Sequence, residues 1–369
     1  MIPFVDIQRF HAPIRAALHA AAIRVIDGGK YIGGEEVKRF EQEMAAGLGV
    51  PEVCGVACAT SGLFAVLKCL GIGPGDEVIT SVHTAIATAE AISWTGAQVV
   101  FGDVQPDFFF LNPQEAEKRI TPRTRAIIPV HLYGQPVDLE AFQGLARAHD
   151  LFLVEDCAQA QGARYRGRPV GTGGDASVFS FFPSKNLGGF GDGGAVVARN
   201  PALMKRIRML SNHGRATKYE HEFEGINSRL DALQAALLRV CLPRVEEWNA
   251  RRRQIAQWYD AGLTGIEPVQ VPRIWPETEP VYHVYVIRAP RRDALQAFLK
   301  ERQIETGIHY PFSLNLQPAY ARLKQTAGFF PQAESVCQQV LSLPMHPAVS
   351  EAEVEQVCEA IRAFYSRRP

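Results

Sequence analysis

The sequence predicts an α/β fold in which a large, mostly parallel central sheet lies between helices and a smaller α+β domain follows. Two observations predict it. Residues 51–200 alternate short, β-rich apolar runs with segments of helical length, a rhythm typical of parallel strands joined by crossover helices. After a long helix-favouring stretch, the pattern changes to an antiparallel α+β composition. With 369 residues, 47% of them apolar, the chain is long enough for two or three domains.

Short apolar runs mark the expected strands of the first part, and several are apolar throughout, as in strands covered on both faces. The expected strands are Glu77–Val82, Gln98–Val104, Ala126–Tyr133, Leu151–Glu155, Ala176–Phe182 and Ala195–Ala198. The segments Ser61–Leu70, Thr84–Trp94 and Leu139–His149 between them are expected to be helices.

The second part begins with a stretch from Ser228 to Leu263 that favours helix and is interrupted only by Pro243, which we expect to kink or end a helix. A strand is expected at Tyr282–Ala289, followed by helices at Arg291–Arg302 and Glu351–Arg367.

These patterns divide the chain into three parts. We expect an N-terminal segment at residues 1–30, a large α/β domain at 31–249 and a small C-terminal domain at 250–369.

Charge and hydropathy argue against two classes of partner. The 39 Lys and Arg residues are cancelled by 39 Asp and Glu, so no global field attracts nucleic acid or a membrane surface. The start, MIPFVDIQRF, lacks the features of a secretory signal, and no later stretch approaches the length of a membrane span. We therefore expect a cytoplasmic protein without a nucleic-acid or membrane partner.

Seven cysteines are scattered through apolar surroundings without a C-x-x-C pair. Cys54 and Cys58 are close in sequence, but no second Cys or His cluster nearby completes four zinc ligands. We expect reduced thiols and no metal site.

An acidic residue follows one of the apolar strands. In EDCAQAQGA, Asp156 comes just past the strand and Gln159 lies one turn further. The carboxyl ends of strands bind the ligands of open α/β sheets, and a buried carboxylate requires a cationic partner. The alternative role is a helix N-cap.

A glycine-rich loop carries a single lysine. In FSFFPSKNLGGFGDGGAVV, Lys185 precedes five glycines within seven residues. The loop matches neither the G-K-[ST] end of a phosphate-binding P-loop nor a dinucleotide motif. A lysine at a strand end suits a Schiff-base amine, because partial desolvation makes it nucleophilic; the alternative is a solvated loop lysine.

A third segment, CATSGLFAVLKCL, places Thr60, Ser61 and Gly62 at the start of a helix. Free backbone N–H groups and the helix dipole favour a phosphate there, although Thr60 or Ser61 would also serve as an ordinary cap. Together with Asp156 and Lys185, this segment supplies the three contacts that pyridoxal 5'-phosphate requires: an imine lysine, an acid for the pyridine nitrogen and a phosphate anchor.

These motifs extend to a resemblance that covers nearly the whole chain. GGKYIGGEEVKRFEQEMA, VEDCAQAQGA, FSFFPSKNLGGFGDGGA, HGRATKYEHEFEGINSRLDALQAALL, IHYPFSLNLQPAY and SLPMHP resemble the sugar aminotransferases of the DegT/DnrJ/EryC1/StrS type. That family belongs to the fold-type-I pyridoxal-phosphate aminotransferases. The resemblance implies an aminotransferase that forms homodimers with shared active sites.

The resemblance assigns roles to individual positions. Lys185 is expected to form the Schiff base and carry the proton, and Asp156 to pair with the pyridine nitrogen. The remaining cofactor contacts implied are Gln159 at the ring's hydroxyl side, Thr60, Ser61 and Ser180 at the phosphate, Asn227 reaching that phosphate from the partner subunit, and His83 where the family usually stacks an aromatic ring.

Other positions indicate the substrate. Asn315 and His346 stand where the family often has His and Tyr, and KNLGGFGDGG departs from its T-x-GEGG form. This version resembles enzymes that aminate C3 of 3-keto nucleotide sugars, including hexuronates. The sugar-side candidates are Arg229, His309 and Tyr310, with Lys218 in a neighbouring segment. Alternatively, Arg229 is a structural residue that binds helix carbonyls, and His309 and Tyr310 lie at a half-buried strand end.

The expected function is therefore transfer of an amino group from an amino acid to a keto-sugar nucleotide, and the resemblance implies that the amino acid is glutamate. Amination of a 4-keto-6-deoxy sugar is the alternative substrate. A sugar dehydratase of the same family carries His in place of the lysine, so Lys185 argues against that activity. A regulatory protein that only binds the cofactor is the rival of another class.

Overall fold

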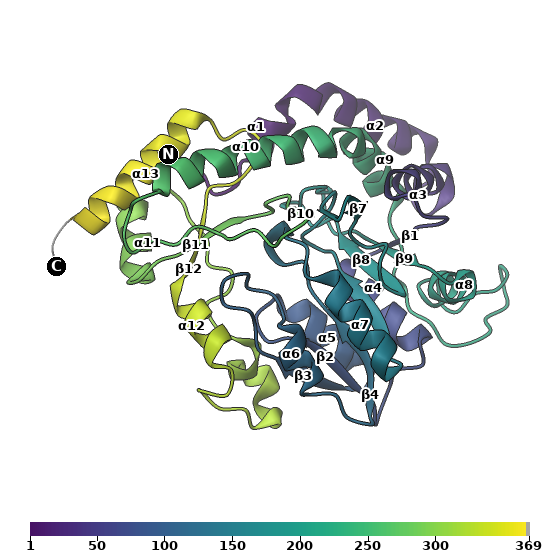
Figure 1. The fold of residues 1–369 in the computed structure, drawn as a ribbon. Helices are drawn as coiled ribbons and strands as arrows, with labels where there is room; N and C mark the ends of the chain where they lie inside the picture. The colour runs from purple at the N-terminus through teal and green to yellow at the C-terminus, as the bar shows by residue number, and fades with distance from the viewer. Residues whose placement is uncertain (367–369) are drawn as a thin grey trace.

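The computed structural model describes residues 1–366, and a seven-stranded sheet in the order β1-β9-β8-β5-β4-β2-β3 forms its centre (Figure 1). The strands are β1 Cys54–Val56, β2 Glu77–Ser81, β3 Gln98–Gly102, β4 Thr124–Ile128, β5 Phe152–Asp156, β8 Ala176–Ser180 and β9 Gly194–Ala198. Neighbours from β3 to β8 pair in parallel, whereas β9 is antiparallel to both β8 and β1. The prediction of a mostly parallel sheet is confirmed.

Helices cover both faces of this sheet. On one side lie α4 Ala59–Cys69, α5 Ile86–Trp94 and α8 Pro201–Leu210, and on the other α6 Pro113–Glu117 and α7 Leu139–His149. Successive strand residues point to opposite faces, so Val78 and Val154 belong to the first core while Ile79 and Leu153 pack with α7. Burial on both faces explains the continuous apolar runs.

A layer of helices crosses one end of the sheet, at the top of Figure 1. It contains α1 Ile7–His11, α2 Arg15–Gly28, α3 Gly34–Leu48, α9 Ala232–Cys241 and α10 Val245–Leu263. The 3₁₀ turn Leu242–Arg244 separates α9 from α10 at Pro243, as predicted. The division expected after residue 249 falls inside the continuous helix α10 and stays a prediction.

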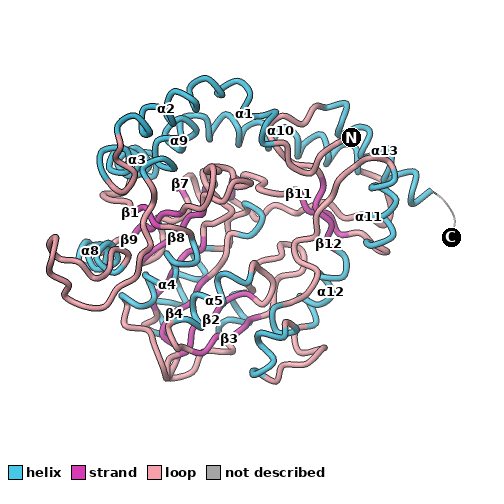
Figure 2. Tube along the Cα trace, turned by 180° about the vertical axis from the view of Figure 1, so that it is seen from behind, coloured by secondary structure: helices cyan, strands magenta, loops and turns pink. Residues whose placement is uncertain are grey.

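The C-terminal part is built around β11 Tyr285–Arg288 and β12 Val340–Leu343, which pair antiparallel. Around them lie α11 Arg292–Glu301, α12 Pro331–Gln339 and α13 Glu351–Ser366, and α13 lies next to the N-terminus in Figures 1 and 2. Ile2 forms a bridge with Ile304. The remaining elements are β6 Arg164–Tyr165, β7 Arg168–Pro169, β10 Thr278–Glu279 and 3₁₀ turns at Ala12–Ile14, Leu132–Gly134, Leu314–Leu316 and Pro318–Leu323.

Several predicted boundaries are wrong. The strand expected to reach Tyr133 ends at Ile128, because Pro129 has no N–H for the ladder, and the chain then turns through Tyr133 at φ 60°. Helix α4 begins at Ala59 with Cys58 as its N-cap, so neither Thr60 nor Ser61 caps it.

Predictions for the end of β5 and for the segment after it also differ from the structure. Asp156 is the last residue of β5 and not a residue past it. The segment after it forms turns instead of a helix. The terminal helix is described only to Ser366, so its predicted end at Arg367 lies outside the described residues.

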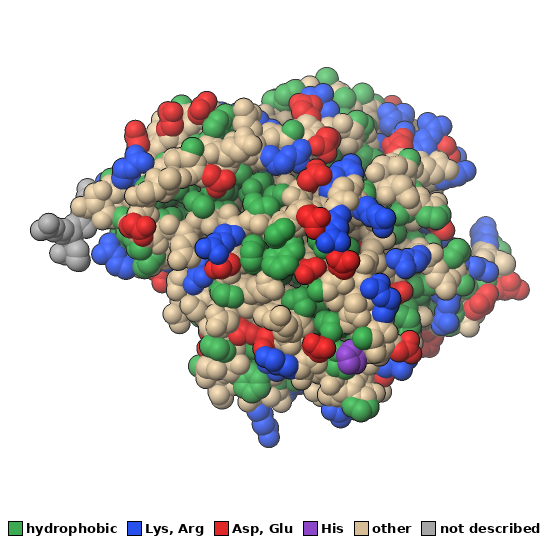
Figure 3. Space-filling model, in the orientation of Figure 1, with side chains coloured by type: hydrophobic (Ala, Val, Ile, Leu, Met, Phe, Trp, Pro, Cys, Tyr) green, Lys and Arg blue, Asp and Glu red, His purple; other side chains and the backbone are tan. Residues whose placement is uncertain are grey.

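The surface carries interspersed charges. Figure 3 shows Lys and Arg mixed with Asp and Glu over the visible face, in line with a formal net charge of zero. Within residues 1–366, no helix combines the length and hydropathy needed to cross a bilayer.

Candidate active site

The candidate site lies where the carboxyl ends of the parallel strands meet. β5 ends in Asp156 and β8 ends in Ser180, five residues before Lys185. Parallel strands bring their carboxyl ends to one edge of a sheet, so these groups are placed together by the topology. Helix α4 begins beside this edge, because a Cβ on Gly194 would lie 2.8 Å from the backbone N of Ala59.

Asp156 is a buried carboxylate, only 4% exposed, whose two oxygens both accept hydrogen bonds. The hydroxyl of Thr88 on α5 donates to Oδ2 at 2.7 Å, and the backbone N–H of Ala158 donates to Oδ1 at 3.0 Å. Both donors are neutral, so the carboxylate has no hydrogen bond from a cationic group among residues 1–366. A buried carboxylate without such a partner is suited to a cationic ligand.

Lys185 reaches the same edge from the loop after β8. Burial lowers the pKa of its amine to about 8, while the Asp156 carboxylate acts in the opposite direction. Its Nζ lies 3.4 Å from Nε2 of His283. Near neutral pH an appreciable fraction of the amine is therefore unprotonated and nucleophilic.

The start of helix α4 offers polar groups suited to a phosphate. Ser61 and Ser228 are joined through their hydroxyls at 2.7 Å, and the Ser61 hydroxyl donates to Cys58 O at 2.9 Å. Thr60 and Ser61 occupy the first helical turn, where backbone N–H groups point outward along the axis. Both are half-buried and accessible to a ligand.

A short network positions Gln159 and Tyr310. The backbone N–H of Tyr133 donates to Gln159 Oε1 at 2.7 Å, and Gln159 Nε2 donates to the Tyr310 hydroxyl at 3.2 Å. The Tyr133 hydroxyl donates to the carbonyl oxygen of His309. The structure therefore brings Gln159, His309 and Tyr310 to one region, and the sequence did not identify Tyr133, which connects them.

His83 is buried, whereas a ring that stacks on a cofactor needs one face open to the ligand. Its ring is 1% exposed, and Nε2 lies 2.7 Å from the Tyr133 hydroxyl while Nδ1 lies 3.3 Å from the Cys337 sulfur. Burial lowers its pKa to about 3. The rings of Tyr133 and Tyr310 meet it edge-on. These contacts indicate a structural role, and stacking on a cofactor stays a prediction that they do not favour.

Ser180 is buried at the end of β8. Its hydroxyl accepts a hydrogen bond from the Phe182 backbone N–H at 3.3 Å, and its carbonyl accepts one from the side chain of Gln161. The hydroxyl thus keeps its own proton available for an acceptor such as a phosphate oxygen.

The segment that carries Asn227 and Arg229 lies beside α4 through Ser228. Asn227 is exposed, and Arg229 donates from Nη1 to Asn212 Oδ1 at 3.1 Å while its Nε is buried without a partner among residues 1–366. Lys218 lies on the exposed loop before this segment. No contact joins Asn227, Arg229 or Lys218 to Lys185 within the described chain.

The site includes residues that the sequence did not indicate: Thr88, Tyr133, Ser228 and His283. Thr88 lies inside a helix and Tyr133 in an apolar run, where neither pattern distinguishes a site residue from a core residue. His283 follows Lys185 by 98 residues. Only the three-dimensional fold brings them to the strand ends.

A buried cluster of possible metal ligands, His131, Glu155 and Cys157, lies nearby. Glu155 already accepts from His131 at 3.0 Å and from three backbone N–H groups of residues 171–174 at 2.7–2.9 Å. Burial, with the Glu155 and Asp156 carboxylates, holds the pKa of the Cys157 thiol well above its usual value. The cluster is therefore a satisfied structural network.

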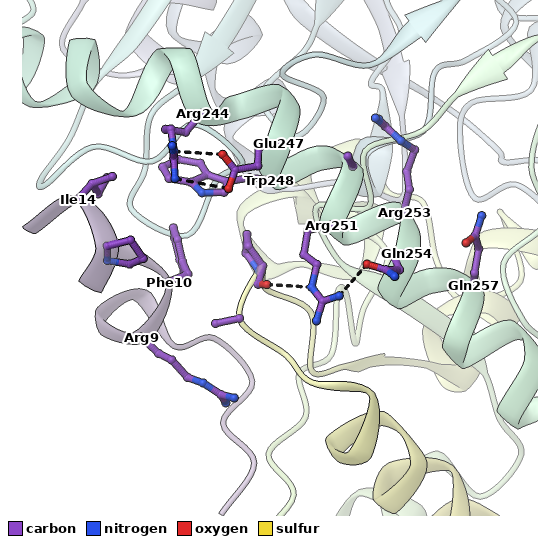
Figure 4. Close-up of a pocket in the computed structure, with 14 residues that line it drawn as sticks. Arg9, Phe10, Ile14, Arg244, Glu247, Trp248, Arg251, Arg253, Gln254 and Gln257 are labelled. Atoms are coloured by element: carbon purple, nitrogen blue, oxygen red, sulfur yellow. Dashed lines mark hydrogen bonds and ion pairs between the residues drawn. The ribbon is translucent and has the colours of Figure 1, made fainter.

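A cavity of about 850 Å³ lies elsewhere, between the N-terminal helices and α10 (Figure 4). Arg9, Arg251 and Trp248 line it, but Arg9 pairs with Glu353 at 2.6 Å and Arg251 donates to the backbone and to a side-chain amide. Its arginines are thus occupied by the protein, and the strand ends stay the candidate site.

The chain is similar to known aminotransferases over nearly its full length. A family described as "DegT/DnrJ/EryC1/StrS aminotransferase family" matches residues 13–362. The dTDP-3-amino-3,4,6-trideoxy-alpha-D-glucose transaminase of Streptomyces venezuelae is 47% identical over 99% of this chain and 97% of its own. The UDP-2-acetamido-2-deoxy-3-oxo-D-glucuronate aminotransferase of Pseudomonas aeruginosa is 40% identical over 98% of this chain and 99% of its own.

Solved structures agree with this similarity. DesV of S. venezuelae, solved in complex with a ketimine intermediate, superposes with a TM-score of 0.98 at 46% identity, covering 100% of this chain and 99% of its own. The sugar aminotransferase Spr1654 of Streptococcus pneumoniae, solved in its PLP form, superposes with a TM-score of 0.89 at 26% identity, covering 95% of this chain and 96% of its own.

Proposed function

Because the chain belongs to the DegT/DnrJ/EryC1/StrS aminotransferase family, we propose that it is a pyridoxal-phosphate-dependent transaminase acting on a nucleotide-linked keto sugar. It takes the amino group from an amino acid, L-glutamate in our proposal, and transfers it to C3 of the sugar. The observation that carries this function is the buried Asp156 carboxylate within electrostatic reach of the buried amine of Lys185.

The residues at the strand ends fit pyridoxal phosphate by their chemistry. When bound, this cofactor supplies an electron-withdrawing ring that stabilises negative charge on a substrate carbon. Asp156, which has only neutral donors, holds a proton at the pyridine nitrogen. The first turn of α4, with Thr60 and Ser61, and the Ser180 hydroxyl bind the phosphate, and Gln159 contacts the hydroxyl side of the ring.

Lys185 has two tasks in this proposal. Its amine would form the covalent link to the cofactor. After release, the amine would take a proton from Cα of the amino-acid donor in the first half of the reaction and deliver one to C3 of the sugar in the second, each time exchanging it with the bound cofactor. The burial that lowers its pKa to about 8 suits both, because the neutral amine accepts a proton and its conjugate acid returns it near neutral pH.

Two features support C3 as the aminated position. The names of both reported relatives place the amino or oxo group at position 3 of the sugar, and the loops around Asn315 and Lys185 resemble C3-aminating enzymes. His309, Tyr310 and Arg229 are proposed to contact the sugar. Burial, aided by Lys185, lowers the pKa of His309 to about 4, so it acts as a neutral hydrogen-bonding group.

We further propose a homodimer in which each site borrows residues from its neighbour. Exposed apolar side chains, suited to burial against a second copy, include Ile26, Tyr31, Ile32, Phe182 and Phe190. An isolated bridge joins Ile32 to Asp231, so this surface continues toward the segment of Asn227, which is exposed. Asn227 and Arg229 then serve the partner's site.

The proposed compartment is the cytoplasm. All seven cysteines are unpaired, and six of them are buried. Free thiols of this kind suit a reducing environment.

The test is an absorbance spectrum of the purified protein before and after adding L-glutamate, followed by a 3-keto sugar nucleotide. We expect the band of the lysine-bound cofactor to convert to that of pyridoxamine phosphate with glutamate, and to return with the sugar. A band that never converts would contradict a transaminase and favour a protein that only binds the cofactor. Conversion without amino-sugar product would contradict the proposed acceptor alone.

A further inference from the structure

His283 faces the amine of Lys185 from a distant part of the chain. Its Nε2 lies 3.4 Å from Lys185 Nζ, and it belongs to the segment that leads into β11, outside the glycine-rich loop. The contact is made to an atom that takes part in the proposed reaction, so His283 is a candidate for a chemical role and not only for packing.

The segment that carries His283 is anchored to the large domain on one side. Asn186, the neighbour of Lys185, donates from Nδ2 to Val281 O at 2.9 Å, and the Val281 N–H donates to Gly134 O at 2.9 Å. A Cβ at Gly134 would lie 2.9 Å from the backbone N of His283. The approach of the segment to the strand ends therefore depends on glycine at position 134, which also adopts φ 92°.

A buried guanidinium anchors the segment on the other side. Arg252 on α10, 2% exposed, donates from Nη1 to the carbonyl oxygens of Tyr282 at 3.1 Å and His283 at 3.2 Å. Asn186 also donates to Asn249 of the same helix at 2.7 Å. Side chains of α10 thus bind both the backbone of His283 and the side chain of Asn186 next to Lys185, which helps to hold the imidazole close to the amine.

The protonation state of the pair follows from these surroundings. Burial, and then the positive charges of Lys185 and Arg252 together with His309, keeps the pKa of His283 well below its usual value, so its ring is neutral at neutral pH. The Lys185 amine, with a pKa of about 8, exists in both forms there. Asp156 is the carboxylate that favours the charged form.

A neutral imidazole can match both forms of the amine. An ammonium group only donates, so His283 Nε2 must then accept and the ring proton lies on Nδ1. A neutral amine has a lone pair, to which a protonated Nε2 can donate. His283 Nδ1 is buried without a hydrogen-bond partner in the described part of the chain, so no protein contact favours one tautomer over the other.

We propose that His283 is a catalytic residue that binds the released ε-amine of Lys185 in both of its protonation states and so keeps it aimed at the reacting carbon. This role rests on the proposed transaminase function. The charged amine only donates, whereas the neutral amine also presents a lone pair. A side chain that only accepts would leave that lone pair without a donor, and a side chain that only donates would face an ammonium group that cannot accept.

The first test uses His283→Phe, which keeps a ring without hydrogen bonding, and His283→Gln, which keeps a donor and an acceptor. With glutamate deuterated at Cα, we expect kcat of His283→Phe to fall about tenfold or more and its isotope effect to increase, while KM for glutamate changes by about twofold or less. The Gln variant should recover part of kcat. The exposed His149→Phe is the matched control and should behave as wild type.

The second test needs no bound cofactor. Cofactor-free protein is labelled with acetic anhydride across a pH series, and modification of Lys185 is measured by peptide mass spectrometry. Because a phenyl ring cannot accept a hydrogen bond from the ammonium form, that form is less stabilised, and the midpoint of the Lys185 labelling curve should move to lower pH in His283→Phe and return toward wild type in His283→Gln. The curves of other lysines should not move.

The outcomes separate this inference from the proposed function. If wild-type protein with cofactor is not fixed at Lys185 by borohydride, the transaminase assignment fails. If it is fixed and active, but His283→Phe keeps its kcat, isotope effect and labelling midpoint, the role of His283 is wrong. Should the Phe variant not fold, His283→Ala must lose kcat and regain part of it with added imidazole; absence of rescue overturns the proposal.

Discussion

The hydroxyl of Thr88 donates to Asp156 Oδ2 at 2.7 Å, which joins the first turn of helix α5 to the end of strand β5. The carboxylate's other oxygen accepts from the backbone N–H of Ala158. The two donors come from different elements, so they fix both the position and the rotation of the carboxylate. Thr88 is thus a positioning residue for the acid that we propose to face the pyridine nitrogen.

Replacing Thr88 by Val preserves the shape of the side chain and removes this donor. Because hydrogen bonds to charged groups contribute about 1.5–3 kcal/mol, we expect the free energy of unfolding to fall by about that amount. Cofactor affinity should weaken as well, because the carboxylate is less well oriented. Urea unfolding and cofactor titration measure the two effects, and Thr88→Ser, which keeps the hydroxyl, is the control. An unchanged Val variant would remove Thr88 from this role.

The Lys185→Ala protein should lose transamination but still bind the cofactor noncovalently. The phosphate and ring contacts proposed for Ser61, Ser180 and Asp156 are separate from the covalent link. Borohydride reduction should therefore attach cofactor permanently to the wild-type protein and not to the variant, as intact-mass spectrometry would record. Equal labelling of the variant would identify another lysine as the true attachment site.

Much of this fold could be predicted because its central strands are covered on both faces and so appear as continuous apolar runs. The runs at β2 and β8 are examples. The three-residue β1, Cys54–Val56, was not predicted, because so short a strand gives no periodicity. Strand β12 was also missed, since it follows directly on α12 and no turn residue separates the two.

The site could be predicted where a local motif marks it and not where it depends on the fold. Lys185 and Asp156 lie in unusual loops directly after strands, so their neighbourhood at the sheet edge was foreseeable. His283 contacts Lys185 from 98 positions away in sequence, and Tyr133 contacts His309 from 176 positions away. The role of His83, which stands where the family usually has an aromatic ring, could not be predicted from the sequence either. What its ring contacts depends on how deeply the fold buries it.

Stability should depend on pH through His346. Burial, with Arg252, lowers its pKa to about 4; Arg9 acts in the same direction, and Asp6 and Glu353 in the opposite one. The ring is 1% exposed. Between pH 4 and the usual value of 6.5, the unfolded chain binds a proton that the folded chain does not. The free energy of unfolding therefore rises with pH across this window and falls as the pH is lowered.

His346→Leu should reduce that slope by up to one proton, or about 1.4 kcal/mol per pH unit. Urea unfolding at several pH values between 4 and 6.5 measures the slope. The same substitution at His149, an exposed residue of α7, is the control, and its slope should equal that of the wild-type protein. An unchanged slope in His346→Leu would show that the buried ring does not contribute to acid instability.

Shared active sites predict complementation between inactive chains. Lys185→Ala and Asn227→Ala are each expected to be inactive as homodimers. A hybrid dimer has one site in which the intact Lys185 of one chain meets the intact Asn227 of the other. After subunit exchange of equal amounts, half of the dimers are hybrids with one working site, so about one quarter of wild-type activity should return.

Native mass spectrometry would show whether hybrids form. Hybrids without returning activity would contradict shared sites, and recovery far above a quarter would indicate that Asn227 is not essential in either chain. The exposed position of Asn227 beside the buried Ser228 is the reason to expect that its side chain faces outward to a partner.

The choice of acceptor depends on charge. A nucleotide sugar carries diphosphate charges and a hexuronate adds a carboxylate, yet the chain has no net charge, so these groups must meet local cations. Arg229 has a buried Nε without a partner in the described residues, and Lys218 is exposed on the adjoining loop. We therefore predict a 3-keto hexose nucleotide as the acceptor, with a uronate favoured over a neutral sugar.

A panel of 3-keto and 4-keto sugar nucleotides, assayed with glutamate, tests this choice. Because an arginine and a carboxylate form a charge-assisted and often bidentate pair, Arg229→Ala should reduce kcat/KM for a uronate by about tenfold or more beyond its effect on a 6-deoxy sugar. Arg229→Lys keeps the charge but lacks the paired N–H donors of the guanidinium group, so it should restore only part of the difference. A clear preference for a 4-keto-6-deoxy sugar would overturn C3 amination, and equal losses on both sugars would remove Arg229 from carboxylate recognition.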